Sequence, residues 1–306
     1  MPASSPMASV PAAPVSRLQE YLQLVKFEHT VFALPFALSA MLLACAPGAW
    51  PPVMTVVWIV LAMVGGRTYA MAINRLLDAR FDAANPRTRG RGIPAGRVKP
   101  VEAWLLVAGA GLLFTLATMQ LPPLCLQLLP LAFVILTVYS LMKRFSSLAH
   151  LVLGVALGSS AVGGWLAVTG AWSNLAVVFG LAVTCWVSGF DVIYACQDVR
   201  IDRRLGLNSL PANLGIARAL WLSRIFHALT VLLLVAFGLA YPHTGGFYGL
   251  AVALTAGMLL YEHWLIRSDD PAVPIRLEKV NEAFFTTNGR ISLAVFVCIL
   301  LDRLLL

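Results

Sequence analysis

Charged residues are scarce in this chain. Asp, Glu, Lys and Arg make up 12% of its 306 residues, whereas the apolar types make up 59%. A soluble globular domain carries about 25% charged residues. So low a charge excludes an ordinary cytosolic enzyme, a disordered chain and a disulfide-rich secreted domain. A chain of this length instead has room for about nine membrane-spanning helices of roughly 20 residues each.

Cysteine pairs and a signal peptide are also missing. None of the five cysteines forms a Cys-x-x-Cys pair, and nearly all lie in apolar runs, so we interpret them as small buried side chains. The first 16 residues are rich in Pro, Ala and Ser and lack a basic region followed by an apolar core. We expect no cleavable signal peptide. We expect residues 1–16 to form a disordered tail and residues 17–306 to form one membrane domain.

Nine apolar runs follow the tail, each near the length that crosses about 30 Å of hydrocarbon. They lack the alternating pattern of barrel strands, so they predict helices. The predicted spans are residues 30–47, 53–74, 100–119, 124–142, 148–169, 172–193, 216–240, 244–266 and 285–304. The predicted fold class is therefore an all-α polytopic membrane protein with nine transmembrane helices.

The connections between these spans alternate in charge. Residues 47–52, 119–123, 170–174 and 241–246 contain no Lys, Arg, Asp or Glu, and the other connections hold nearly all the charge. Cytoplasmic loops of membrane proteins carry an excess of Lys and Arg. The pattern predicts a cytoplasmic N-terminus, charged loops on the cytoplasmic side and an external C-terminus.

Two similar acidic segments end the second and the sixth spans. Residues 74–82 read NRLLDARFD, and residues 194–202 read YACQDVRID. The spacing of four predicts that each trio lies on one helix face. The equivalent positions are Asn74 and Tyr194, Asp78 and Asp198, and Asp82 and Asp202, each pair 120 residues apart. This constant offset indicates two repeated four-helix units plus a ninth helix, and convergent spacing is the alternative.

Four carboxylates at the edge of a membrane are expected to bind a cation. Like charges repel one another near a low-dielectric medium and are costly to desolvate there. Mg²⁺ prefers oxygen ligands and bridges carboxylates to substrate phosphates, while arginine binds phosphate oxygens. The two segments and the arginines near them therefore predict a Mg²⁺-dependent diphosphate site. The alternative is a pair of solvated helix ends balanced by arginine, which two equivalent copies disfavour.

These segments resemble the two Asp-rich motifs of the UbiA superfamily of intramembrane prenyltransferases. Residues 87–96 look like its RTxxRPLPxG loop, residues 139–144 look like its YxxxKR segment, and Arg67 also matches. Arg75 departs from the pattern, because many members have an Asp there. The resemblance spans about residues 20–300. Longer stretches are similar to 4-hydroxybenzoate polyprenyltransferase-like proteins of the futalosine branch of menaquinone synthesis.

The resemblance implies an enzyme of quinone biosynthesis. It would transfer a polyprenyl group from an allylic diphosphate to a hydroxylated aromatic carboxylate, either 4-hydroxybenzoate or a dihydroxynaphthoate. Mg²⁺ is the implied cofactor, and the implied partners are polyprenyl diphosphate, the aromatic acid and membrane lipid, without nucleic acid. The implied location is the bacterial inner membrane, with the active site on the cytoplasmic side. A lipid or haem acceptor and a secondary transporter remain as alternatives.

Particular residues are expected in each role. The residues expected to act in catalysis are Asp78, Asp82, Asp198, Asp202, Asp191 and Tyr194, with Asn74 joining the first four as a metal ligand. The expected diphosphate ligands are Arg67, Arg87, Arg91, Lys143 and Arg204, and the expected acceptor ligands are Lys26 and His29. Headgroup anchoring is an equal alternative for Lys26, and it is the favoured role of Arg89, Arg97 and Lys99. For Asp191 the alternative is an ion pair with Arg67 or Lys143.

Overall fold

The computed structural model of the chain describes residues 16–24, 30–270 and 274–305. Within these ranges the chain is helical and contains no β-strand, which confirms the predicted all-α class. The long helices are α2 (Thr30–Ala44), α3 (Val53–Leu77), α5 (Pro100–Thr118), α6 (Pro123–Met142), α7 (Ala149–Thr169), α8 (Asn174–Ala195), α11 (Ile216–Ala240), α12 (Gly246–Leu265) and α13 (Asn288–Leu305). The short elements are α1 (Arg17–Leu24), α4 (Ala79–Ala84), η2 (Cys196–Asp198), α9 (Val199–Leu205), α10 (Leu210–Leu214), η3 (Leu277–Lys279) and η4 (Glu282–Thr287).

Each predicted apolar run falls on one of these long helices. Seven helical stretches of the described chain are long and apolar enough to cross a membrane. The apolar stretch of α2, Phe32–Ala44, is shorter, and α12 is not among the seven. The structure therefore confirms a multi-pass helical membrane protein.

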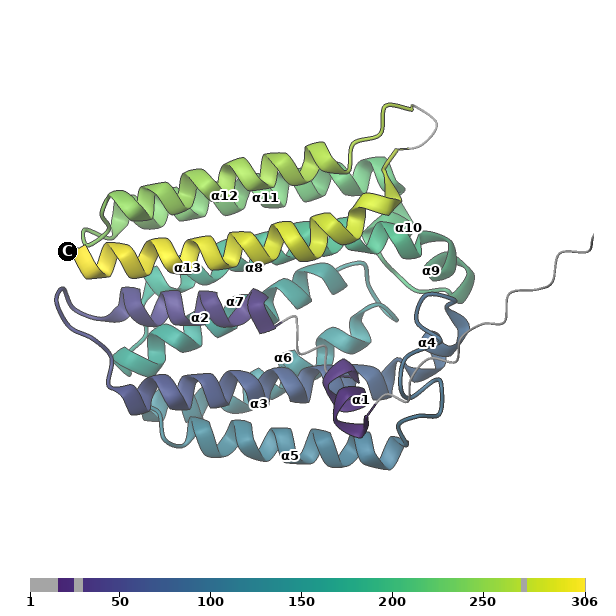
Figure 1. The fold of residues 1–306 in the computed structure, drawn as a ribbon, viewed down its shortest axis with the longest axis horizontal. Coiled ribbons are helices and arrows are strands. Elements are labelled where there is room, and N and C mark those ends of the chain that lie inside the picture. Colours follow the sequence, from purple (N-terminus) through teal and green to yellow (C-terminus); the bar gives the residue numbers. More distant parts are fainter. Residues whose placement is uncertain (1–15, 25–29, 271–273, 306) are drawn as a thin grey trace, which may run out of the picture.

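The long helices lie side by side along the longest axis of the molecule (Figure 1). The short helices α4, α9 and α10 lie at one end, opposite the C-terminus. They belong to the charged connections that the sequence assigns to one side of the membrane. The structure thus places the ends of both acidic segments at the same end of the bundle.

The prediction that each acidic trio shares one face of a regular helix is wrong. Helix α3 ends at Leu77, and Asp78 adopts φ −90° and ψ 2° before α4 begins. Helix α8 likewise ends at Ala195, and Asp198 adopts φ −103° and ψ 3° before α9 begins. This bridge conformation turns the chain out of the helical path, and it is sparsely populated except in turns and active sites. Both segments therefore bend at the equivalent aspartate.

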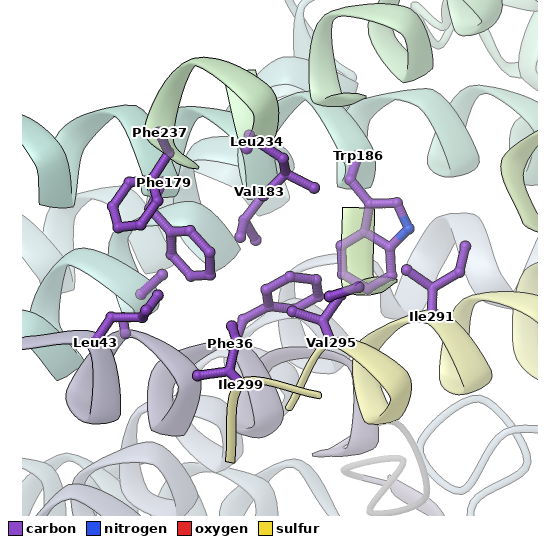
Figure 2. Close-up of a cluster of buried hydrophobic side chains, with 14 of the residues drawn as sticks. Phe36, Leu43, Phe179, Val183, Trp186, Leu234, Phe237, Ile291, Val295 and Ile299 are labelled. Carbon is purple, nitrogen blue, oxygen red and sulfur yellow. The ribbon is translucent and has the colours of Figure 1, made fainter. Parts of the chain in front are cut away.

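Helix α8 lies at the centre of the bundle. Its side chains Phe179, Val183 and Trp186 are buried against Phe36 of α2 and Phe237 of α11, as Figure 2 shows. Close packing of these side chains fixes the helix in one position, because helices in a membrane associate through van der Waals contact. The rigid core therefore holds the end of α8, which carries the second acidic segment.

Helix α7 packs closely against α8 because glycines face the contact. A Cβ atom on Gly154 would clash with the Ser188 side chain and the Thr184 backbone, and one on Gly158 would clash with the Gly180 backbone. Small residues let helices in a membrane approach one another closely. This contact brings the start of α7 beside the last turns of α8.

Candidate active site

The first acidic segment forms a local network. Asn74 donates its amide N–H to Asp78 Oδ2 at 2.8 Å. The buried Asp82 accepts two hydrogen bonds from Arg91 Nη1, at 2.7 and 2.8 Å. Arg144 extends across α4, donates to the backbone oxygen of Leu77 at 2.6 Å and lies 3.7 Å from Asp78. Each carboxylate of this segment is therefore matched by a cation.

The loop after the first segment reaches across to the second. Arg87 donates from Nε to Asp198 Oδ1 at 3.0 Å and forms an ion pair with Oδ2 through Nη2. Asn85 adds an amide hydrogen bond to Asp198 Oδ1 at 3.1 Å. Burial disfavours the charge on Arg87, but the hydrogen bond and charge of Asp198 outweigh this and raise its pKa. The two acidic segments are thus parts of a single site.

Tyr194 and Asp202 complete the second segment. The Tyr194 hydroxyl accepts a hydrogen bond from Arg87 Nη1 at 2.8 Å, and the Arg87 guanidinium lies 5.1 Å from the centre of the Tyr194 ring. Phe284 packs on the same ring, with a centroid separation of 4.2 Å. Asp202 is buried and accepts a hydrogen bond from Ser209 Oγ at 2.8 Å. Tyr194 therefore sits at the boundary between the charged site and the apolar core.

Lys143 lies among the carboxylates of both segments. Burial opposes the charge on its ammonium group, but Asp202, Asp191 and Asp198 attract it, and the net effect raises the pKa of Lys143. The pKa of Asp78 is raised by burial and by the charge of Asp82, against the opposing charge of Lys143. Buried like charges of this kind are stabilised by an added cation.

The oxygen donors present suit Mg²⁺. Asn74, Asp78, Asp82, Asp198 and Asp202 supply hard amide and carboxylate oxygens of the type this ion prefers. Within the described ranges, no three His, Cys, Asp or Glu side chains are gathered closely enough to enclose a metal ion by themselves. An ion held by one or two carboxylates and completed by water and phosphate oxygens matches this arrangement, and it matches the usual preference of Mg²⁺.

Asp191 pairs with a residue that the sequence analysis did not select. His150 Nδ1 lies 2.6 Å from Asp191 Oδ2, so the alternative for Asp191, an ion pair with Arg67 or Lys143, is not what the structure shows. His150 and Asp191 are separated by 41 residues, and Asn85 and Asp198 by 113. No local spacing signals such pairs, because they depend on how the helices pack.

The other expected ligands differ in position. Arg67 lines the cavity described below, whereas Arg204 is exposed on α9 and has no hydrogen bond or ion pair within the described part of the chain that links it to the site. Lys26 and His29 lie outside the described residues. The sequence favours headgroup anchoring as the role of Arg97. In the structure Arg97 also contacts the protein itself, because it donates to Glu20 Oε1 at 2.6 Å.

An apolar cavity of about 460 Å³ extends from the charged end into the bundle. Arg67 and Tyr139 line it near the acidic segments, and Leu121 and Trp172 line it near the other end. Its walls come from α3, α5, α6, α7 and α8. On α6 alone the lining runs from Cys125 to Tyr139, which is about 21 Å along the helix. The cavity has the shape and lining for a long apolar chain.

Known proteins are similar to this chain in sequence. Residues 33–288 match the UbiA prenyltransferase family. The 4-hydroxybenzoate octaprenyltransferase of Aromatoleum aromaticum is 29% identical over 296 residues, covering 95% of this chain and 97% of the relative. That of Nitrosococcus oceani is 30% identical over 272 residues, covering 88% and 94%.

Solved structures give the same result. The apo structure of a UbiA homologue from Aeropyrum pernix K1 has a TM-score of 0.80 and 35% identity, covering 90% of this chain and 98% of that one. A UbiA homologue from Archaeoglobus fulgidus bound to DMAPP and Mg²⁺ has a TM-score of 0.75 and 20% identity, covering 94% and 100%. The chain belongs to the UbiA prenyltransferase family. The predicted class of enzyme, a prenyltransferase, is thereby confirmed and is favoured over a transporter.

Proposed function

We propose that this protein transfers a polyprenyl group from its diphosphate to a hydroxylated aromatic carboxylate in quinone biosynthesis. The observation that carries the proposal is the link from Arg87 to Asp198, which joins two acidic segments at the mouth of an apolar cavity. A diphosphate needs the charged site, and a polyprenyl tail needs the cavity. The curated relatives named above are 4-hydroxybenzoate octaprenyltransferases, which supports an aromatic acceptor.

The diphosphate would lie between the two acidic segments. Arg87, Arg91 and Lys143 supply cations around it, and Arg67 faces its tail. Asn74, Asp78, Asp82, Asp198 and Asp202 supply the oxygen atoms that would hold Mg²⁺. Mg²⁺ held by these residues would stabilise the charge that develops on the departing diphosphate. Arg204, which is exposed on α9, is proposed as a further cation of this set.

The reaction exchanges one bond for another. The allylic carbon–oxygen bond breaks, and the diphosphate leaves with the electron pair. A ring carbon of the acceptor donates an electron pair to the allylic cation, and the ring then loses a proton. Tyr194, whose ring already lies beside the Arg87 guanidinium, would stabilise the allylic cation through the same π electrons. Asp191 would accept a hydrogen bond or a proton from the acceptor.

The candidate functions differ in the acceptor molecule. 4-Hydroxybenzoate follows from the names of the curated relatives, and a dihydroxynaphthoate follows from the resemblance to the futalosine branch. Both are hydroxylated aromatic acids, and Lys26 and His29 are proposed to bind the carboxylate. A lipid or haem acceptor is the second candidate, because the donor site alone does not define the acceptor.

The proposed location and orientation of the protein rest on the arrangement of charge in its loops. We place the protein in the bacterial inner membrane, with α2 and α12 completing nine spans and residues 17–306 forming the membrane domain. The matching bends at Asp78 and Asp198 support a duplicated four-helix unit with α13 added. The basic loops support a cytoplasmic active site, at the end of the bundle where α4 and α9 lie.

An acceptor screen tests this function. Purified protein in lipid vesicles receives Mg²⁺, a polyprenyl diphosphate and one of three acids: 4-hydroxybenzoate, 1,4-dihydroxy-6-naphthoate or 1,4-dihydroxy-2-naphthoate. Mass spectrometry then measures the prenylated acid. We expect product with one acid, and none with that acid in the Asp78→Asn and Asp198→Asn variants. Intact donor binding without product from any acid would overturn the aromatic assignment and favour a lipid or haem acceptor.

A further inference from the structure

His150 lies at the start of α7 with no exposed surface, between two parts of the site. Its Nδ1 atom is 2.6 Å from Asp191 Oδ2 on α8. Its Nε2 atom accepts a hydrogen bond from the backbone N–H of Leu210 at 3.3 Å. Both ring nitrogens are therefore engaged, one by a carboxylate and one by a backbone donor.

These two contacts define the tautomer of the imidazole. A backbone N–H can only donate, so Nε2 must carry a lone pair rather than a proton. The single proton of the neutral ring is then on Nδ1, where it is donated to Asp191 Oδ2. Because Oδ2 is occupied in this way, Asp191 Oδ1 is the oxygen left for another partner, and no described residue forms a hydrogen bond with it.

The surrounding structure fixes this geometry. Gly154, one turn after His150, permits the close contact of α7 with Ser188 of α8. Ser188 Oγ also lies 3.3 Å from the backbone oxygen of His150. Leu210 follows Ser209, whose hydroxyl donates to Asp202 and caps α10. His150 thus joins Asp191 to the segment whose Ser209 hydroxyl contacts Asp202, an expected metal ligand on α9.

We propose that His150 is a positioning residue for the acceptor reaction. Its Nδ1–H holds Asp191 Oδ2 and leaves Oδ1 to accept the hydroxyl of the aromatic acceptor. Its Nε2 accepts the Leu210 N–H, so the orientation of the ring depends on how residues 206–210 pack against α7. The inference rests on the proposed function for the identity of the acceptor, but the tautomer and the orientation of Asp191 do not depend on that identity.

Two substitutions distinguish the hydrogen-bonding role of His150 from the volume that its side chain fills. His150→Gln keeps one donor and one acceptor, whereas His150→Leu keeps volume and removes both. We expect His150→Leu to lower kcat by about 10- to 100-fold, the usual cost of losing the residue that orients a functional group. We expect His150→Gln to recover most of that loss. The Kd for donor diphosphate, measured by titration without acceptor, should stay within about twofold in both variants, since neither nitrogen contacts the donor ligands directly.

A double-variant comparison tests whether His150 acts through Asp191. In the Asp191→Asn background, adding His150→Leu should lower kcat by less than about twofold, because the two residues act as one unit. Equal kcat in His150→Leu and the parent would overturn the proposal. So would a full additional loss in the double variant, or an equal loss in His150→Gln and His150→Leu.

Nitrogen-15 NMR of the histidines provides a readout independent of activity. We expect the signals that vanish in His150→Gln to show a neutral ring protonated on Nδ1, and we expect Asp191→Asn to shift them. A ring protonated on Nε2, or an imidazolium, would overturn the proposal. If the parent protein forms no product with any acid, the proposed function fails, and the NMR result alone then decides the role of His150.

Discussion

Arg87 forms an ion pair with Asp198, although the two residues are 111 positions apart, since Arg87 follows the first acidic segment and Asp198 lies within the second. The same guanidinium donates to the Tyr194 hydroxyl. A planar fork that contacts a carboxylate and a phenol at once is well suited to hold a phosphate oxygen as well. Arg87 therefore joins the two halves of the site, and we expect it to contact the diphosphate.

Substitution of Arg87 should weaken donor binding more than it affects folding. A hydrogen bond to a charged group contributes about 1.5–3 kcal/mol, so Arg87→Ala should weaken diphosphate affinity roughly 10- to 100-fold. Arg87→Lys should recover only part of this loss, because an ammonium group lacks the fork. Titration of the protein with a non-reactive polyprenyl diphosphate analogue measures both. Unchanged affinity in Arg87→Ala would show that the guanidinium has only a structural role.

The α7–α8 contact should be sensitive to a single methyl group. Gly154→Ala places a Cβ against Ser188 and Thr184, so we expect a loss of about 1–3 kcal/mol of stability from overpacking. Gly163→Ala is the matched control, because no atom lies within 4 Å of a Cβ at that position. Thermal unfolding in detergent should show a lower Tm for the first variant only. A similar Tm in both variants would argue against close packing at Gly154.

The length of donor accepted should depend on the cavity. Ala132 lines it seven residues before Tyr139, which is about 10 Å along α6 from the charged end. Ala132→Phe should block the deeper part, so the rate with a long polyprenyl diphosphate should fall at least tenfold relative to the rate with geranyl diphosphate. Val134→Phe, on the exposed side of the same helix, should leave this ratio unchanged. Equal rates with both donors in Ala132→Phe would place the tail elsewhere.

Helix α1 should affect donor binding through the loop that carries Arg87 and Arg97. The buried Glu20 pairs with Arg97, which also donates to the backbone oxygen of Gly90 at 2.7 Å. Glu20→Gln should loosen the loop that carries Arg87 and raise the KM for the donor about tenfold, since the hydrogen bond from Arg97 then goes to a neutral amide instead of a carboxylate. Steady-state kinetics with Arg89→Gln as the control should separate this effect from a general loss of charge. A normal KM in Glu20→Gln would show that α1 does not brace the loop.

The long helices and the two acidic segments could be predicted from the sequence. Apolar runs of membrane-spanning length place the long helices, and the constant offset of 120 residues identifies the two acidic segments. The sequence was not sufficient for the bends at Asp78 and Asp198, because the spacing of four is also satisfied by a straight helix. It also missed His150, because a single histidine at a helix start carries no signal until the packing of α7 on α8 places it beside Asp191.

A double-variant cycle on donor binding tests most directly whether the two acidic segments form one Mg²⁺-dependent diphosphate site. The measurement is the affinity of a non-reactive polyprenyl diphosphate, with and without Mg²⁺, in the parent, Asp78→Asn, Asp198→Asn and the double variant. We expect each single variant to lose most of the Mg²⁺-dependent affinity and the double variant to lose little more, since the two residues would share one ligand. Losses that add fully, or Mg²⁺-dependent affinity that survives either single substitution, would contradict the account.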